Sequence, residues 1–135
     1  MISALEGHGE PFRQDDRLLA FIADIQIHKS DTCLTFDVSL KDEALNPLGI
    51  LHGGALGALF DVAMYEVAKR CGEMVTVSQE TKFLSAIRAE RPLQIVAEPL
   101  RLGRTSACCT ARAVQGEKIC GFATAQYARI EVRAT

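Results

Sequence analysis

The sequence predicts an α+β domain in which one long helix packs against a curved antiparallel sheet of five to six strands. Apolar residues recur at helical spacing through residues 53–70, and much of the remaining chain alternates between apolar and polar residues with a period of two. Short turn signals separate the alternating runs. Consecutive strands joined by short turns pair antiparallel, and one helix on one face of such a sheet is an α+β arrangement.

The first half of the domain is expected to begin with a hairpin. Leu18–His28 and Cys33–Leu40 are the two predicted strands, with Ser30-Asp31 as the turn between them. A polar loop over 41–49 follows and contains the turn pair Asn46-Pro47.

The central helix is expected over Gly53–Arg70. Most of its surface is apolar, which is typical of a helix buried nearly all round. Its end, with Glu66, Lys69 and Arg70, is expected to be solvated, and Gly72 can terminate it.

Four further strands complete the predicted sheet. Gly103 and Gln115-Gly116 supply turn signals between the later ones. The expected strands are Met74–Leu84, Pro92–Leu102, Thr105–Val114 and Lys118–Val132.

Length and composition limit the remaining possibilities. The chain has 135 residues, 48% hydrophobic and 24% charged, which is typical of one globular domain. We expect a lead-in segment over residues 1–16, loose or a short helix, and a single domain over 17–135. The net charge of −2 argues against a nucleic-acid partner. With no long apolar run and no signal-peptide pattern, we expect no membrane association and a cytoplasmic location.

The five cysteines do not suggest a disulfide framework or a metal site. They are odd in number and show no C-x-x-C spacing, so they are expected to be small reduced core residues. The three histidines are scattered along the sequence. No metal is expected.

Gly53 and Gly54 open the predicted helix, although glycine costs about 1 kcal/mol there relative to alanine. One interpretation is a close approach by a ligand, because unpaired N–H groups at a helix start suit a polarised carbonyl or an oxyanion. The alternative is close packing of the helix on the sheet.

Asp61 stands among apolar neighbours on the same helix. An ionised carboxylate is costly to bury without partners. Asp61 is therefore either a catalytic carboxylate in a cleft or a structural residue that caps a loop or pairs with an arginine. Along one helix, Gly53 and Asp61 are roughly 12 Å apart. If both are catalytic, a second chain must bring its helix alongside in the opposite sense, which predicts a two-fold dimer with shared sites.

This stretch resembles the hotdog-fold acyl-CoA thioesterases of the phenylacetate-pathway type, a group related to thioesterase superfamily member 2. The resemblance rests on the spacing N-x-x-G-x-x-H-G-G-x-x-x-x-x-x-D, which here comprises Asn46, Gly49, His52-Gly53-Gly54 and Asp61. It extends from about Leu18 to Val132 and implies a hotdog fold, with a sheet wrapped around the central helix.

The resemblance also implies roles for individual residues. Asp61 would attack the thioester or activate water, and the Gly53 N–H would polarise the carbonyl. Asn46 would orient the carbonyl or the water, while His52, with Gly54, would order the helix start beside the substrate. A Ser or Thr on the next strand would assist the carboxylate. Thr76 is the expected match and Ser78 the alternative, and strand alternation places both on one face.

The expected reaction is hydrolysis of an acyl- or aryl-CoA, with coenzyme A as part of the substrate and no separate cofactor. The absence of a G-x-S-x-G motif argues against a serine hydrolase. Basic residues of the later strands and turns are candidates for contact with the phosphates: Lys82, Arg88, Arg91, Arg101 and Arg104. The expected assembly is a homodimer, or a tetramer made of two dimers.

Two alternatives remain open from the sequence. The first is a non-catalytic module that binds or senses acyl-CoA. The second is a hotdog dehydratase, in which His52 and Asp61 would serve as base and acid.

Overall fold

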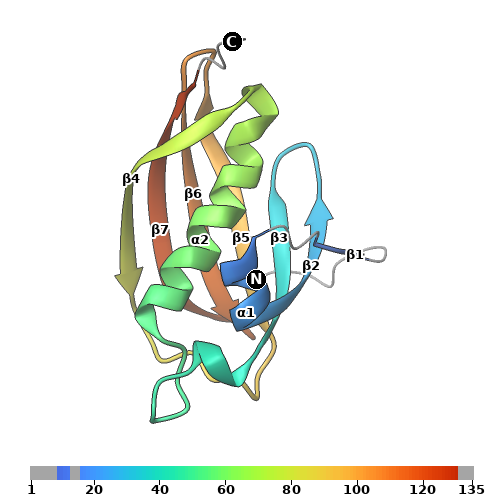
Figure 1. Ribbon diagram of the computed structural model, residues 1–135, viewed down its shortest axis with the longest axis vertical. Coiled ribbons are helices and arrows are strands. Elements are labelled where there is room, and N and C mark those ends of the chain that lie inside the picture. Colours follow the sequence, from blue (N-terminus) through green and yellow to red (C-terminus); the bar gives the residue numbers. More distant parts are fainter. Residues whose placement is uncertain (1–8, 13–15, 131–135) are drawn as a thin grey trace.

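The structure is a computed structural model that describes residues 9–12 and 16–130. A long helix, α2 (Gly53–Ala68), lies across one face of an antiparallel sheet (Figure 1). The seven strands follow the order β1-β2-β3-β5-β6-β7-β4, so that β4 forms one edge. The other elements are β1 (Glu10–Pro11), α1 (Arg17–Ile22), β2 (Ala23–Lys29), β3 (Leu34–Leu40), η1 (Asp42–Ala44), η2 (Lys69–Cys71), β4 (Met74–Phe83), β5 (Leu93–Leu102), β6 (Ser106–Gln115) and β7 (Lys118–Arg129).

The predicted α+β class is confirmed, and one predicted strand is wrong in its first part. The stretch expected as the strand Leu18–His28 begins as helix α1 and becomes β2 only at Ala23. The Asp16 side chain caps this helix by accepting hydrogen bonds from the N–H groups of Leu18 and Leu19, at 3.0 and 3.2 Å. Leu19 and Ile22 are buried at helical spacing. The cap was not recognised as a helix start.

The lead-in segment contributes the seventh strand where the structure describes it. Glu10 and Pro11 pair with β2, and the ring of Phe12 lies 5.0 Å from that of Phe36. This part is neither loose nor helical as expected. Residues 1–8 and 13–15 of the lead-in segment lie outside the described residues, as does the predicted end of the last strand beyond Ile130. The division at residue 16 stays a prediction.

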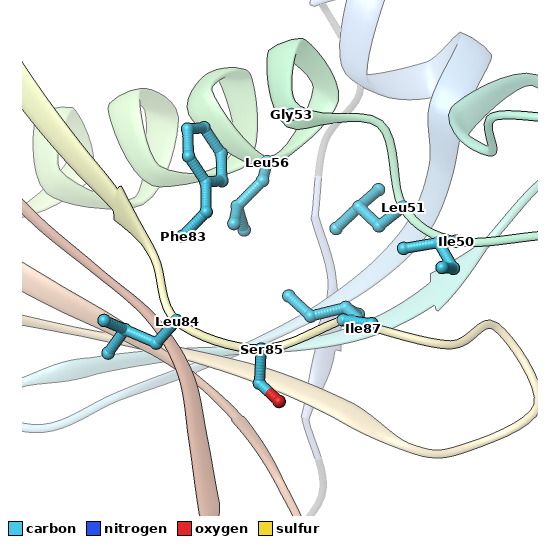
Figure 2. Close-up of a pocket in the computed structure, with 9 residues that line it drawn as sticks. Ile50, Leu51, Gly53, Leu56, Phe83, Leu84, Ser85 and Ile87 are labelled. Carbon is cyan, nitrogen blue, oxygen red and sulfur yellow. The ribbon is translucent and has the colours of Figure 1, made fainter.

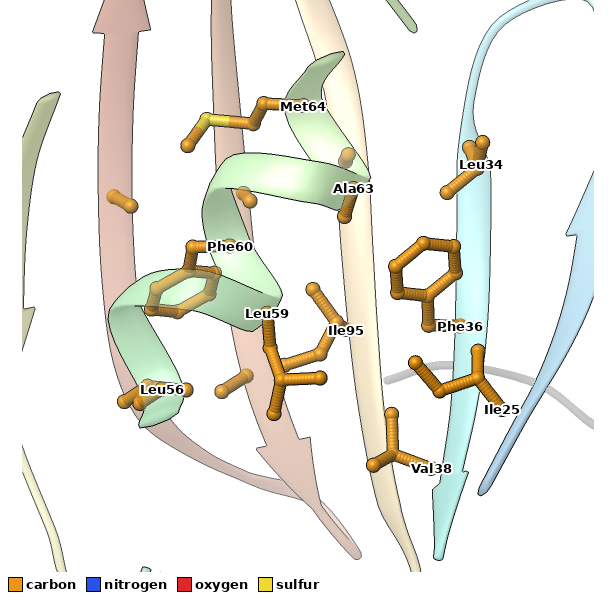
Figure 3. Close-up of a cluster of buried hydrophobic side chains, with 14 of the residues drawn as sticks. Ile25, Leu34, Phe36, Val38, Leu56, Leu59, Phe60, Ala63, Met64 and Ile95 are labelled. Carbon is orange, nitrogen blue, oxygen red and sulfur yellow. The ribbon is translucent and has the colours of Figure 1, made fainter. Parts of the chain in front are cut away.

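The core lies between α2 and the sheet (Figure 3). Leu59, Phe60, Ala63 and Met64 are fully buried on the inner side of the helix. Burial of each large apolar side chain contributes about 1.5–3 kcal/mol. The helix approaches β7 so closely that a Cβ at Gly121 would lie 3.1 Å from Leu56 Cδ2 and 3.3 Å from Phe60 Cζ.

The helix is not buried all round in the single chain. Its outer face, made of Gly57, Ala58, Asp61, Val62 and Tyr65, is half-buried, and Gly54 is exposed. This outer face carries small and apolar residues that a second surface can cover.

Two expectations about burial are wrong. Glu66, expected in solvent, is 8% exposed, and Lys69 reaches back one turn to pair with it at 2.7 Å. Of the five cysteines, all free, Cys109 and Cys120 are buried, whereas Cys33, Cys71 and Cys108 are half-buried. Cys108 and Cys109 are adjacent in β6 and face opposite sides of the sheet, so only one reaches the core. Burial raises the pKa of the Cys109 thiol to about 11.

Within the described residues, no helix is long and apolar enough to cross a membrane. The same part of the chain contains no group of three or more residues placed to hold a metal ion.

Candidate functional site

The loop before α2 is shaped by Asn46. Its side-chain Oδ1 accepts hydrogen bonds from the N–H groups of Leu48 and Ile50, at 2.9 and 3.1 Å. The Gly49 N–H closes the turn on the Asn46 carbonyl at 2.9 Å, and Gly49 has a φ of 75°, which suits glycine. Asn46 therefore fixes the path of the loop through its oxygen. Its amide nitrogen makes no hydrogen bond to a described residue.

His52 ends this loop and caps the helix. Its Nδ1 accepts a hydrogen bond from the Gly54 N–H at 3.0 Å. The Leu51 N–H bonds to the Ile87 carbonyl at 2.9 Å, which ties the loop to the segment after β4. Gly53 is the first helical residue. In the part of the chain that the structure describes, its N–H has no acceptor, so this donor is available to a ligand.

An open pocket of about 410 Å³ lies beside Gly53 (Figure 2). Its lining is apolar except for Ser85: Ile50, Leu51, Gly53, Leu56, Phe83, Leu84, Ser85, Ala86 and Ile87. The Phe83 ring is 62% exposed. It stands so close to the helix start that a Cβ at Gly53 would lie 3.2 Å from two of its atoms. The free N–H therefore lies at the margin of an apolar pocket.

The Asp61 carboxylate is held by two hydroxyl groups. Thr76 Oγ1 donates to Asp61 Oδ1 at 2.8 Å. The Tyr127 hydroxyl lies 3.1 Å from the same Oδ1 and 2.9 Å from the Asp61 carbonyl oxygen. Burial, and then the Asp61 charge, raise the pKa of Tyr127 above its usual range, so its hydroxyl remains a donor. Asp61 Oδ2 makes no hydrogen bond to a described residue.

These contacts do not fit the purely structural interpretations of Asp61. Its carboxylate forms no ion pair with any Lys or Arg, and accepts no hydrogen bond from a loop N–H, within residues 9–12 and 16–130. Asp61 is half-buried and receives support from hydroxyl donors on β4 and β7. That arrangement is compatible with a carboxylate that faces a cleft.

A bulge in β4 separates Thr76 from Ser78, contrary to the expectation that they share a face. Thr76 pairs with Tyr127, whereas Ser78 pairs with Gln126, the next residue along β7. The register shift at Val77 places Ser78 on the face opposite Thr76, and both Ser78 and Gln126 are exposed. Ser78 therefore points away from Asp61, and Thr76 alone of the two meets the carboxylate.

Within one chain the candidate residues form two groups. Asn46, His52, Gly53 and Gly54 gather at the start of α2, while Asp61 and Thr76 meet two turns further on. The continuous helix keeps the two groups roughly 12 Å apart.

Arg104 belongs to neither group. It lies in the turn between β5 and β6, and its carbonyl accepts a hydrogen bond from Arg129 at 3.4 Å. The adjoining Ile130 N–H bonds to the Glu73 carbonyl at 3.1 Å, which places this turn at the end of the molecule where α2 finishes.

Tyr127 was missed by sequence reasoning. The only signal was a tyrosine within an apolar stretch of the last strand. Its link to Asp61 depends on the β4–β7 register, which the sequence does not specify.

Solved structures resemble this fold over most of its length. Thioesterase superfamily member 2 of zebrafish has a TM-score of 0.74 at 19% identity, over 87% of this chain and 87% of that chain. A mutant thioesterase of Pseudomonas aeruginosa gives 0.70 at 23% identity, over 77% and 79%. A putative thioesterase of Ralstonia eutropha, related to phenylacetic acid degradation, gives 0.72 at 27% identity, over 78% and 84%. These similarities confirm the predicted hotdog fold.

A family comparison agrees with the structural one. No match was found among the curated proteins. The family model described as "Thioesterase superfamily" matches residues 48–121, a segment that begins in the loop before α2 and ends within β7. Because this match covers more than half of the sequence, the chain belongs to the thioesterase superfamily.

Proposed function

We propose that this chain hydrolyses the thioester of an acyl- or aryl-CoA, giving a carboxylic acid and free coenzyme A, at sites shared between two copies. The observation that carries the proposal is the Asp61 carboxylate. Two hydroxyl groups hold its Oδ1, while Oδ2 stays free of hydrogen bonds to the described residues on a half-buried helix face. Membership of the thioesterase superfamily supports the reaction type.

The proposed chemistry divides between the two ends of the site. The Gly53 N–H, at the positive end of α2, donates to the thioester oxygen as negative charge develops there. Asp61 Oδ2 attacks the carbonyl carbon or takes a proton from an attacking water. The C–S bond then breaks and the coenzyme A thiolate leaves. In the first route an anhydride joins the acyl group to Asp61, the thiolate takes a proton from water, and a second water hydrolyses the anhydride to release the acid and restore the carboxylate. In the second route the water oxygen becomes part of the acid directly, and the proton held by Asp61 passes to the thiolate. In this proposal Asn46 orients the carbonyl or the water through its amide nitrogen, which bonds to none of the described residues.

A second copy is needed because the two groups lie too far apart on one helix. Two antiparallel α2 helices would place the Gly53 of each chain beside the Asp61 of the other. The half-buried outer face of α2 supports this arrangement. So does the neighbouring edge strand β4, where Val75 and Val77 are 42% and 61% exposed. Assembly of two such dimers into a tetramer stays a prediction.

The pocket beside Gly53 supports an uncharged apolar acyl group, either aromatic or a medium-length fatty chain. Its side chains supply apolar contacts around the free N–H, and none of them is charged. Arg88 follows the lining residue Ile87, and both Arg88 and Arg91 are exposed. They are candidates to meet the phosphates of coenzyme A at this end of the molecule.

The alternatives are less well supported. His52 and Asp61 of one chain are nine positions apart, roughly 13 Å, so a dehydratase would also have to pair them across two copies. The Nδ1 of His52 is already used to cap the helix. A sensing module would bind acyl-CoA without turnover, and has little use for a carboxylate that two hydroxyls support and whose Oδ2 bonds to no residue in the part of the chain that the structure describes.

The test is thiol release from a panel of acyl- and aryl-CoAs by the parent chain and by Asp61→Asn. We expect kcat to fall by about a hundred-fold or more, the scale of lost acid–base catalysis. Asp37→Asn is the matched control, because Asp37 is also half-buried but lies on β3. Unchanged turnover by Asp61→Asn would reject the mechanism. Binding without thiol release from any substrate would favour the sensing module.

A further inference from the structure

We infer that Tyr127 is a positioning residue for catalysis, holding the Asp61 carboxylate through its hydroxyl so that only Oδ2 faces the substrate. This inference rests on the proposed function. It adds a residue from β7 to a site that the family resemblance builds from the loop, the helix and β4 alone.

The Tyr127 hydroxyl contacts two atoms of Asp61. Its hydroxyl lies 2.9 Å from the Asp61 carbonyl oxygen and 3.1 Å from Oδ1. The hydroxyl has a single proton, which these two acceptors share, so the bond bridges the backbone and the carboxylate of Asp61 and restricts the rotation of the carboxylate relative to the helix. Thr76 donates to the same Oδ1 at 2.8 Å from the other strand. The two hydroxyls therefore leave Oδ2 as the reactive oxygen.

The two hydroxyls approach together because Thr76 and Tyr127 are paired across β4 and β7. The bulge at Val77 comes directly after this pair, so that Ser78 pairs with the outward-facing Gln126. The pair is thus the point at which the sheet presents two adjacent donors to α2. Tyr127 is 1% exposed, so its hydroxyl exchanges its protein acceptors for water only if the sheet opens.

Tyr127 donates throughout the pH range of the assay. Burial and the neighbouring carboxylate raise its pKa, so the phenol does not ionise near neutral pH. It therefore acts on Asp61 as a neutral donor and is not a general base. Truncation of the hydroxyl should weaken the orientation of the carboxylate, with little effect on substrate binding at the pocket beside Gly53.

The first experiment compares Tyr127→Phe with Thr35→Val. Tyr127→Phe removes one hydroxyl and keeps the buried ring. Thr35→Val also removes one buried hydroxyl, but from β3, outside the proposed site. We expect Tyr127→Phe to lower kcat about ten- to a hundred-fold with KM changed less than about threefold. Thr35→Val should match the parent enzyme. Equal kcat values for parent and Tyr127→Phe would overturn the inference.

The second experiment separates positioning from a general structural role by a double-mutant cycle. If Tyr127 acts through Asp61, then adding Tyr127→Phe to the Asp61→Asn variant should not lower kcat any further. A role in packing alone would lower kcat by the same factor in both backgrounds, and that result would contradict the inference. Melting temperatures check the fold, and we expect Tyr127→Phe to melt within about 5 °C of the parent.

The outcomes also separate this inference from the proposed function. Loss of turnover in Asp61→Asn together with full turnover in Tyr127→Phe would reject the role of Tyr127 and leave the proposed function intact. Full turnover in Asp61→Asn would reject the role of Asp61 and this inference with it, although the chain would still be a thioesterase. No thiol release by the parent chain from any substrate would reject the proposed function itself.

Discussion

The N–H group of Gly53 can be removed without rebuilding the helix that carries it. Gly53 occupies the first helical position, where proline is well tolerated because no intrahelical hydrogen bond is lost. The preceding His52 has a φ of −65° and a ψ of 136°, an extended conformation that proline accepts in its neighbour. This single residue therefore allows a direct test of the proposed oxyanion donor.

We expect Gly53→Pro to lower kcat about a hundred-fold or more, the scale of a lost oxyanion-hole donor. Gly53→Ala is the matched control, because it keeps the N–H while placing a Cβ against the same Phe83 ring, 3.2 Å away. The ring is exposed and can move, so the alanine variant should stay within about threefold of the parent enzyme. Steady-state kinetics of thiol release measure kcat for the proline and alanine variants. Equal losses in both variants would assign the effect to crowding at Phe83 and reject the N–H donor.

At the scale of single elements, the position of α2 over the sheet depends on its close contact with β7. Gly121 lies under the helix, and a Cβ there would meet Leu56, Phe60 and the Lys82 carbonyl at 3.1, 3.3 and 3.4 Å. Two of these neighbours are core side chains and the third is backbone, so none gives way easily. The same packing places Asp61 over the Thr76–Tyr127 pair.

We therefore expect Gly121→Ala to lower the free energy of unfolding by about 1–3 kcal/mol through overpacking. Urea unfolding followed by circular dichroism measures this change. A variant as stable as the parent would show that the helix can lift from β7 without cost, which contradicts the tight packing described for this contact.

The sequence predicts an element well when the pattern that specifies it lies in neighbouring residues, and poorly when the element depends on contacts distant in the sequence. The helical period of α2 and the alternation in β3 come from neighbouring residues, and both elements formed within a few residues of their predicted bounds. The start of Leu18–His28 failed because Asp16, a local cap, was not recognised. The bulge at Val77 and the partnership of Tyr127 with Asp61 depend on strand register, which is set by tertiary packing.

At the scale of the whole molecule, the two groups of proposed site residues do not meet within one chain. The proposed oxyanion donor, the Gly53 N–H, is at the start of α2, and the Asp61 carboxylate is two turns along it. α2 lies in front of the sheet with β4 at the edge beside it (Figure 1), and the outer face of α2 is half-buried in the single chain. A second copy placed there would cover small and apolar residues and would complete two identical sites.

The most direct test of this shared site is complementation in a mixed dimer. Asp61→Asn and Gly53→Pro chains, each with its own affinity tag, are co-expressed, and the mixed dimer is isolated through both tags. If each site takes its Gly53 from one chain and its Asp61 from the other, the mixed dimer has one intact site out of two. It should show about half of the parent thioesterase activity, although each homodimer is nearly inactive. If the mixed dimer is no more active than the two homodimers, the site is not shared between chains.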